Sequence, residues 1–365
     1  MGRGRVIARR VGLGLAVLFV LLVAYLFLWP VPLDPEAWNP PPAVALDGVW
    51  ARNDRLARGE LLGETLHGPE AVAFDARGRA ITGTMGGDLV AIDASGAVSP
   101  IARTGDGGRP LGIKIAADGS ILVADATLGL MRVVPGGATK LLADAQGGRR
   151  FRFTDDLDLL PDGSVVFTDA SSERGVHEFR MEVLDHRPNG RLLRHDPATG
   201  ATTLVAARLY FPNGVAAAPD GESVIVCETS SYRLLRVFVT GARAGQREVF
   251  LDRLPGFCDN VTWSGASHRY WVAIGSPRDA TLDALSPRPF LRKMVARLPA
   301  FAQPDPKPFG MAIAVSDTGQ VLDVLMDPDG RFGPFASVIE HDGALYLGTY
   351  SGHGVLRVPL EPSAN

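Results

Sequence analysis

The sequence has little cysteine and little excess charge. Only two of its 365 residues are cysteine, which excludes a disulfide-rich scaffold and any cysteine-rich zinc or iron–sulfur framework. Basic and acidic residues nearly balance, 37 against 40. The chain therefore lacks the positive surplus typical of a nucleic-acid-binding protein, and we expect no nucleic acid among its partners.

Several common enzyme motifs are also missing. The chain has no GxSxG nucleophile elbow, no HExxH zinc motif and no phosphate-binding P-loop. Glycine and proline are abundant instead, with 42 and 27 residues, which suits many tight turns and disfavours a helical bundle.

One long apolar run lies near the N-terminus. Residues 11–29 carry no charge and match the roughly 20 residues that a helix needs to cross a bilayer. Four arginines precede the run, and Tyr25 and Trp29 lie where an aromatic belt would. The positive-inside rule then predicts a cytoplasmic basic tail at 1–10, a single-pass transmembrane anchor at 11–29 and an exported remainder, periplasmic in a bacterium and lumenal or extracellular in a eukaryote.

A cleaved signal peptide is the alternative to this anchor. Signal peptides usually have a shorter apolar run and end in small residues, whereas this run ends in Leu-Trp-Pro-Val-Pro. Residues 30–50 follow as a proline-rich stalk, which we expect to be semi-rigid and extended.

From residue 60 the chain repeats one local pattern. Short apolar runs flank an Asp-Gly or similar turn, as in β-hairpins, and most hairpins continue into a third apolar run. These turns are about 40–80 residues apart, at positions 78, 119, 163, 221, 267 and 343. Repeats of this kind are typical of a propeller, so we predict an all-β, six-bladed β-propeller over 51–362. A two-domain β protein is the alternative.

Two long gaps between the repeats predict insertions. They cover residues 171–190 and 276–310. Within the second, residues 287–301 are basic and amphipathic. We expect this segment to cover the mouth of the central channel, and contact with the membrane surface is the alternative.

Four of the six repeats carry a side-chain oxygen at one equivalent position. Counting eight residues back from each turn gives Glu70, Leu111, Asp155, Asn213, Asp259 and Phe335. Equivalent positions at the start of the inner strands face one shared channel in a propeller. We therefore expect the four oxygens to converge there, with Asn260 beside Asp259 as a fifth ligand.

Such a set of oxygens indicates a metal site. Carboxylates and carboxamides without a histidine or cysteine partner suit a hard cation, and several protein oxygens in flexible geometry favour Ca²⁺ over Mg²⁺. Without a cation the three acids would repel one another. Asp and Asn that merely cap turns are the alternative, but the shared register across four repeats favours Ca²⁺.

A set of short motifs resembles the strictosidine synthase-like family. The wider group includes the gluconolactonases, or senescence marker protein family, and the paraoxonases. The matching stretches are GPE at 68–70, FTDDLDLLPDGSVVFTD at 153–169, FPNG at 211–214, PGFCDN at 255–260, LSPRPFLRKM at 285–294, DPDG at 327–330 and EHDGALYLGTY at 340–350.

The resemblance implies a six-bladed propeller with calcium in its central channel. The family's metal glutamate matches Glu70, its central asparagine is replaced by Asp155, and its Asn-Gly asparagine matches Asn213. Its Asp-Asn pair matches Asp259 and Asn260.

Two departures limit which activity the resemblance implies. Ala336 fills the slot of the catalytic glutamate of strictosidine synthase, and Leu111 in the stretch 109–112 replaces the histidine of the paraoxonase HPHG motif. The activity that the resemblance still implies is a calcium-dependent hydrolase of esters or lactones, arylesterase- or lactonase-like. The resemblance to the gluconolactonases makes Asp259 the first candidate for the general base, and Asp156 is the second. The alternatives are a non-catalytic calcium-stabilised scaffold and, less favoured, a strictosidine synthase-like lyase.

Overall fold

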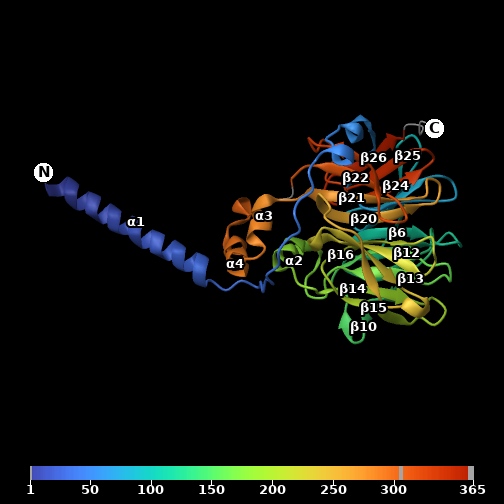
Figure 1. Ribbon diagram of the computed structural model, residues 1–365, viewed down its shortest axis with the longest axis horizontal. Coiled ribbons are helices and arrows are strands. Elements are labelled where there is room, and N and C mark those ends of the chain that lie inside the picture. Colours follow the sequence, from blue (N-terminus) through green and yellow to red (C-terminus); the bar gives the residue numbers. More distant parts are fainter. Residues whose placement is uncertain (1, 304–306, 361–365) are drawn as a thin grey trace.

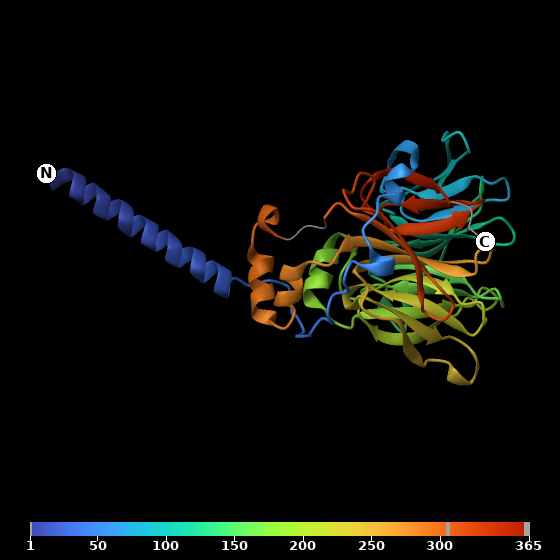
Figure 2. The ribbon, with the colours of Figure 1, turned by 45° about the horizontal axis from the view of Figure 1, so that its top comes forward.

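The computed structural model describes residues 2–303 and 307–360, and these contain six four-stranded antiparallel sheets (Figure 1). The predicted all-β, six-bladed propeller is confirmed. One long helix, α1 (Gly2–Leu28), projects away from it. Between α1 and the blades lie three short helices (Figures 1 and 2), which are α2 (Phe179–Asp185), α3 (Ala280–Leu285) and α4 (Pro289–Arg297).

The first three blades follow one another along the chain, each strand pairing with the next. Blade 1 consists of β2 (Val72–Phe74), β3 (Ala80–Gly83), β4 (Asp88–Ile92) and β5 (Val98–Arg103). Blade 2 consists of β6 (Pro110–Ile115), β7 (Ile121–Asp125), β8 (Gly129–Val133) and β9 (Thr139–Ala143). Blade 3 consists of β12 (Thr154–Leu159), β13 (Val165–Asp169), β14 (Gly190–His195) and β15 (Thr202–Leu209).

The last three blades complete the ring. Blade 4 consists of β16 (Pro212–Ala217), β17 (Ser223–Glu228), β18 (Arg233–Phe238) and β19 (Arg247–Leu251). Blade 5 consists of β20 (Gly256–Ser264), β21 (Arg269–Pro277), β22 (Gly310–Val315) and β23 (Val321–Asp327). Blade 6 consists of β24 (Ser337–His341), β25 (Ala344–Gly348), β26 (His353–Pro359) and, from the start of the propeller, β1 (Glu60–His67). Because β1 pairs with β26, the two ends of the propeller sequence close the ring.

Short elements connect these strands. A small hairpin is formed by β10 (Ala145–Gln146) and β11 (Arg149–Arg150). The 3₁₀ helices are η1 (Gly48–Trp50), η2 (Arg55–Arg58), η3 (Val176–Glu178), η4 (Thr229–Ser231), η5 (Gly241–Arg243) and η6 (Ala300–Ala302).

The hydrophobic core is a series of layers between neighbouring blades. Ile81 of blade 1 packs with Val123 of blade 2, for example, and Trp271 of blade 5 packs with Leu345 of blade 6. Because each sheet is covered on both faces, its middle strands are apolar runs without strict alternation. The two cysteines, Cys227 and Cys258, are buried free thiols in one of these layers.

Both predicted insertions lie on the same face of the propeller. Thr154 at the start of β12 pairs with Asp169 at the end of β13, and Gly256 at the start of β20 pairs with Pro277 at the end of β21. The chain leaves β13 and β21 into the insertions, so the helices α2, α3 and α4 stand above the ends where the inner strands begin. The six turns lie at the other ends.

The boundaries at the two ends differ slightly from those predicted. Helix α1 begins at Gly2, so residues 2–10 continue the helix of the apolar run. The segment 30–47 has no helix or strand, as expected of an extended stalk, but it packs along the insertions. At the C-terminus, positions 361–362 of the predicted propeller lie outside the described residues.

Candidate functional site

Four of the five predicted metal ligands line one cavity. The cavity has a volume of about 1180 Å³ and opens on the face that carries the helices. Its lining includes Glu70, Asp155, Asn213 and Asp259, which come from four different blades. The fifth, Asn260, is 2% exposed and follows Asp259 on β20, but it is not among the lining residues.

Local irregularities in the inner strands place these side chains. The pairing register shifts between Thr154 and Leu157 on β12, between Pro212 and Val215 on β16, and between Cys258 and Val261 on β20. A β-bulge interrupts the ladder and redirects side chains. In each case the interrupted stretch contains the predicted ligands, so bulges turn Asp155, Asn213 and Asp259 toward the channel instead of into the sheet-to-sheet layers.

Gly214 lets two inner strands approach closely at this level. A β-carbon at Gly214 would lie 2.4 Å from the Asn260 Cα atom. Any side chain there would push β20 away from β16. In the Asn-Gly sequence, Asn213 therefore provides an amide oxygen, and Gly214 allows the two strands to lie close together.

The site has an unusual concentration of buried polar atoms without a protein partner. Asp155 Oδ1, Asn213 Oδ1, Asp259 Oδ1 and both polar side-chain atoms of Asn260 are buried and accept or donate no hydrogen bond. An unpaired polar atom in the interior costs free energy, typically 1–3 kcal/mol. Oxygen atoms left free in this way fit the donor set of a hard cation.

The carboxyl groups of the site also carry an electrostatic cost. Burial raises the pKa of Asp155 well above its usual value, and the charges of Glu70 and Asp259 add to the rise. Burial likewise raises the pKa of Asp259, with Glu70 again contributing. The negative charges of the three acids therefore disfavour one another, and a bound cation would relieve the repulsion.

Arg109 is the site residue that the sequence reasoning missed. Its Nη2 atom donates to Glu70 Oε2 at 2.7 Å, and its Nη1 atom donates to the Gly68 carbonyl oxygen at 2.8 Å. Burial raises the pKa of Glu70, and the Arg109 charge opposes that rise. Within 2–303 and 307–360 no group of three or more His, Cys, Asp or Glu side chains forms a metal cluster.

Two signals in the sequence could have revealed Arg109. It is a charged residue directly before the inner strand β6, and it lies two positions before Leu111, which also lines the cavity. The count of equivalent positions reaches Leu111 in this repeat and therefore does not include Arg109.

Asp156 lies behind the cavity wall instead of in it. Its Oδ2 atom accepts a hydrogen bond from the Val215 backbone N–H at 3.0 Å, so it ties β12 to β16. Burial raises its pKa to about 7, although the nearby Lys114 charge opposes the rise. This geometry describes a residue that positions two strands.

The insertions build the cavity walls. Phe179, Arg180 and Val183 of α2 line one side. The second insertion contributes its two ends, through Asp279, Leu282, Gln303, Lys307 and Pro308. None of the residues 287–301 appears among the described lining residues, so covering of the mouth by this segment stays a prediction. Its helix packs against α1 and α2.

Solved structures share this fold. A gluconolactonase from Xanthomonas campestris superposes with a TM-score of 0.60 at 17% identity, covering 92% of this chain and 99% of that chain. A calcium-binding protein, regucalcin, from Agrobacterium tumefaciens superposes with a TM-score of 0.57 at 18% identity, covering 83% and 94%. The chain therefore has the propeller fold of these two structures.

Sequence comparison gives the family. The model for strictosidine synthase matches residues 155–242, and the model for the strictosidine synthase-like N-terminal region matches residues 48–92. The adipocyte plasma membrane-associated protein of Rattus norvegicus is 34% identical over 94% of this chain and 97% of its own length, and that of Salmo salar is 36% identical over 96% and 89%. The chain belongs to the strictosidine synthase-like family, together with these adipocyte plasma membrane-associated proteins.

Proposed function

We propose that this chain is a membrane-anchored, Ca²⁺-dependent hydrolase of esters or lactones, arylesterase- or lactonase-like. The observation that carries the proposal is the group of unpaired buried oxygens at Asp155, Asn213 and Asp259, which lies in a cavity of about 1180 Å³. A cavity of this size accommodates a small organic substrate, and apolar side chains such as Leu111, Phe153 and Phe179 contribute to its walls.

The channel oxygens would hold the cation. Asp155, Asn213, Asp259 and Glu70 are the ligands that the cavity offers, with the buried amide of Asn260 beside them. When bound, Ca²⁺ supplies a positive charge that polarises an ester or lactone carbonyl and stabilises the oxyanion formed from it.

Asp259 is the candidate general base. Its carboxyl group lies in the cavity, and one of its oxygens has no hydrogen-bond partner. From that position it can take a proton from a water molecule that attacks the carbonyl carbon. Arg109 holds Glu70 in place, and Asp156 holds β16 against β12.

Helix α1 is proposed to anchor this propeller in a membrane. Residues Gly4–Leu28 form a helix long and apolar enough to span a bilayer. With the arginines at its N-terminus on the cytoplasmic side, the propeller would lie on the exported side.

The test uses the full chain purified in detergent. Bound calcium is measured, then thermal stability with and without a chelator, then hydrolysis of phenyl acetate and a set of small lactones. Bound calcium with chelator-sensitive hydrolysis supports the proposal. Bound calcium without hydrolysis favours a calcium-stabilised scaffold, consistent with Ala336 and Leu111 at the two family catalytic slots, and absence of calcium contradicts the site itself.

A further inference from the structure

Helix α4 contributes nothing to the cavity, yet it is tightly fixed in the structure. It lies in the second insertion and packs against α1, α2 and α3. Figures 1 and 2 show it between the end of α1 and the propeller.

Arg297, the last residue of α4, caps the C-terminal end of α1. Its Nη1 atom donates to the Leu26 carbonyl oxygen at 2.8 Å, and its Nε atom donates to the Trp29 carbonyl oxygen at 2.6 Å. The last carbonyl groups of a helix have no partner within the helix, and a cation there also interacts favourably with the helix dipole. Arg297 is only 8% exposed, so the end of α1 is bound to α4.

Aromatic contacts extend the same junction. The Tyr25 hydroxyl donates to the Arg297 carbonyl oxygen at 3.0 Å, and the rings of Phe27 and Phe290 are 5.3 Å apart. Tyr25 lies where the apolar run of α1 ends, which is the depth of the lipid headgroups for a helix that spans a bilayer. Since α4 contacts this level directly, it lies at the same depth.

The outer surface of this insertion is apolar and basic. Phe290 is 47% exposed even though it contacts Phe27, and Phe301 is 91% exposed. Arg288 is exposed next to the helix, whereas Lys293 is half-buried and pairs with Asp34 of the stalk. Exposed aromatic side chains with flanking basic residues are the composition of a helix that lies in a membrane interface.

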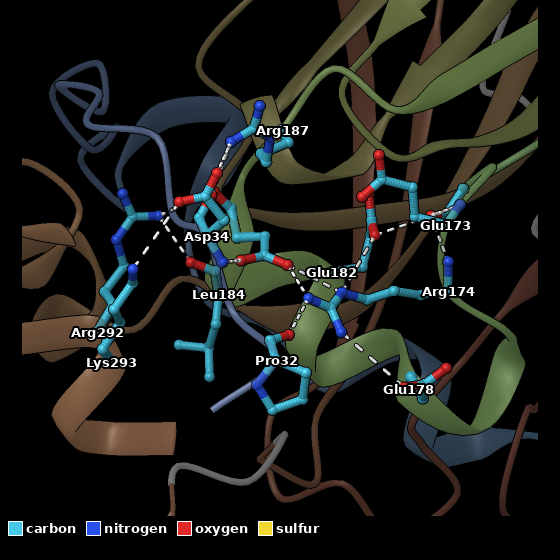
Figure 3. Close-up of polar contacts among 12 residues, drawn as sticks. Pro32, Asp34, Glu173, Arg174, Glu178, Glu182, Leu184, Arg187, Arg292 and Lys293 are labelled. Atoms are coloured by element: carbon cyan, nitrogen blue, oxygen red, sulfur yellow. Dashed lines mark hydrogen bonds and ion pairs between the residues drawn. The ribbon is translucent and has the colours of Figure 1, made fainter. Parts of the chain in front are cut away.

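The stalk connects this surface rigidly to the cavity (Figure 3). Arg292 of α4 donates to the Leu184 carbonyl oxygen of α2 at 2.8 Å and also to the Glu36 carbonyl oxygen of the stalk. Arg174 donates to the Pro32 carbonyl oxygen at 2.6 Å and pairs with Asp185 at the end of α2. Because α2 forms a wall of the cavity, the position of α4 determines how the cavity mouth is placed.

We propose that α4 and Phe301 form a contact surface for the lipid bilayer that contains α1. This contact holds the cavity-bearing face of the propeller against the membrane. The inference relies on the anchoring role proposed for α1, but it does not depend on hydrolase activity.

Site-directed spin labelling of the full chain tests this proposal. The chain is reconstituted into vesicles of phosphatidylcholine with one-quarter phosphatidylglycerol, about the anionic content that attracts basic surfaces. Phe301→Cys is the test variant. Leu18→Cys in α1 and Asp342→Cys, in the β24–β25 turn on the opposite face, are the controls. Cys227 and Cys258 are completely buried, so the introduced cysteine is labelled selectively.

The readout is the accessibility of each label to oxygen, which enriches in lipid, and to a water-soluble nickel chelate. We expect the label at 301 to be several-fold less accessible to nickel than the label at 342, approaching the label at 18. If 18 is in lipid and 301 is as accessible to nickel as 342, the contact proposal is overturned while the anchor stands. If the labels at 18 and 301 are both in water, the anchor is overturned as well.

Discussion

The aspartates of the hairpin turns and those of the central channel are held in opposite ways. On the turn face, Asp162 accepts hydrogen bonds from the Ser164 backbone N–H at 3.0 Å and from its hydroxyl at 2.6 Å, and it also pairs with Arg194. The Ser164 hydroxyl and the other bonds lower its pKa. On the helix face, Asp155 and Asp259 each keep a buried oxygen without a partner, and burial raises the pKa of both.

We propose that this difference separates structural acids from functional ones. An acid whose oxygens are all bonded within its own hairpin stabilises that turn and has no remaining capacity for a ligand. An acid held buried and unpaired costs stability unless something else occupies its oxygens. The same arrangement occurs in another blade. There Asp118 accepts a hydrogen bond from the Ser120 hydroxyl and pairs with Arg132.

The largest expected effect of this difference concerns turnover. Asp259→Ala removes both a cation ligand and the proposed base, so we expect hydrolysis of phenyl acetate to fall at least 100-fold, in the range of lost acid–base catalysis. Asp162→Ala is the matched control and should retain turnover within about two-fold, because surface substitutions away from a site have small effects. Equal losses in both variants would argue against a specific role of Asp259.

Calcium removal should have the next largest effect. A ligand that binds only the folded state stabilises it by RT ln(1 + [L]/Kd), which is about 2.7 kcal/mol at 100 times Kd. We expect a chelator to lower the thermal midpoint of the wild-type chain by several degrees, measured by scanning calorimetry. The Asp162→Ala variant should show the same decrease in midpoint. The Asn213→Ala variant should show a smaller decrease, because it lacks one oxygen ligand.

Asp155→Asn should change stability in opposite directions with and without calcium. Without calcium, the substitution removes one of three mutually repelling buried acids, so we expect a higher midpoint than in the wild type. With calcium, the variant should gain less stability, since a charged ligand is lost. Thermal unfolding in chelator and in about 5 mM calcium measures the two midpoints. This calcium concentration exceeds the dissociation constants typical of weak extracellular calcium modules. A lower midpoint in chelator would show that the three acids do not repel.

A smaller effect is expected in α2, where Glu182 tests the same principle away from the channel. Its Oε2 atom accepts a hydrogen bond from the Ser171 hydroxyl at 2.8 Å, whereas its buried Oε1 atom has no partner. Burial raises the pKa of Glu182 from 4.5 to about 7. The protonated form is therefore the one that the fold favours.

The sign of the pH dependence follows from this rise. The stability that the group contributes is complete below pH 4.5 and is lost as the pH rises through about 7. Glu182→Gln resembles the neutral form, so we expect it to be more stable than the wild type by about 1–3 kcal/mol at pH 8, with no difference at pH 4. Chemical denaturation at the two pH values measures this, and a constant difference would contradict the assignment.

The sequence predicted the blades and most of the site because the signals are local and repeated. Each turn fixes a hairpin, and counting back from it reaches Glu70, Asp155, Asn213 and Asp259, which the structure does bring to one cavity. The same count could not reveal Arg109, because its importance depends on contact with Glu70, 39 residues away.

Contacts between distant segments were beyond prediction. Arg297 is 271 residues from Leu26, and Arg292 is 256 residues from Glu36. The amphipathic pattern of 287–301 predicted a helix with one apolar side, but pattern alone does not say which surface that side meets. In the structure, the helix of this segment packs against α2 and against the C-terminal end of α1. None of its residues is among the described residues that line the cavity.

The calcium content of the purified chain tests the central claim most directly. The wild-type chain and an Asp155→Asn/Asn213→Ala variant are dialysed against the same buffered calcium solution, and bound calcium is measured by atomic emission. We predict calcium bound to the channel oxygens of the wild-type chain, and its loss in the variant while the propeller remains folded by circular dichroism. Equal calcium in both proteins, or none in the wild type, would contradict the account of the channel as a cation site.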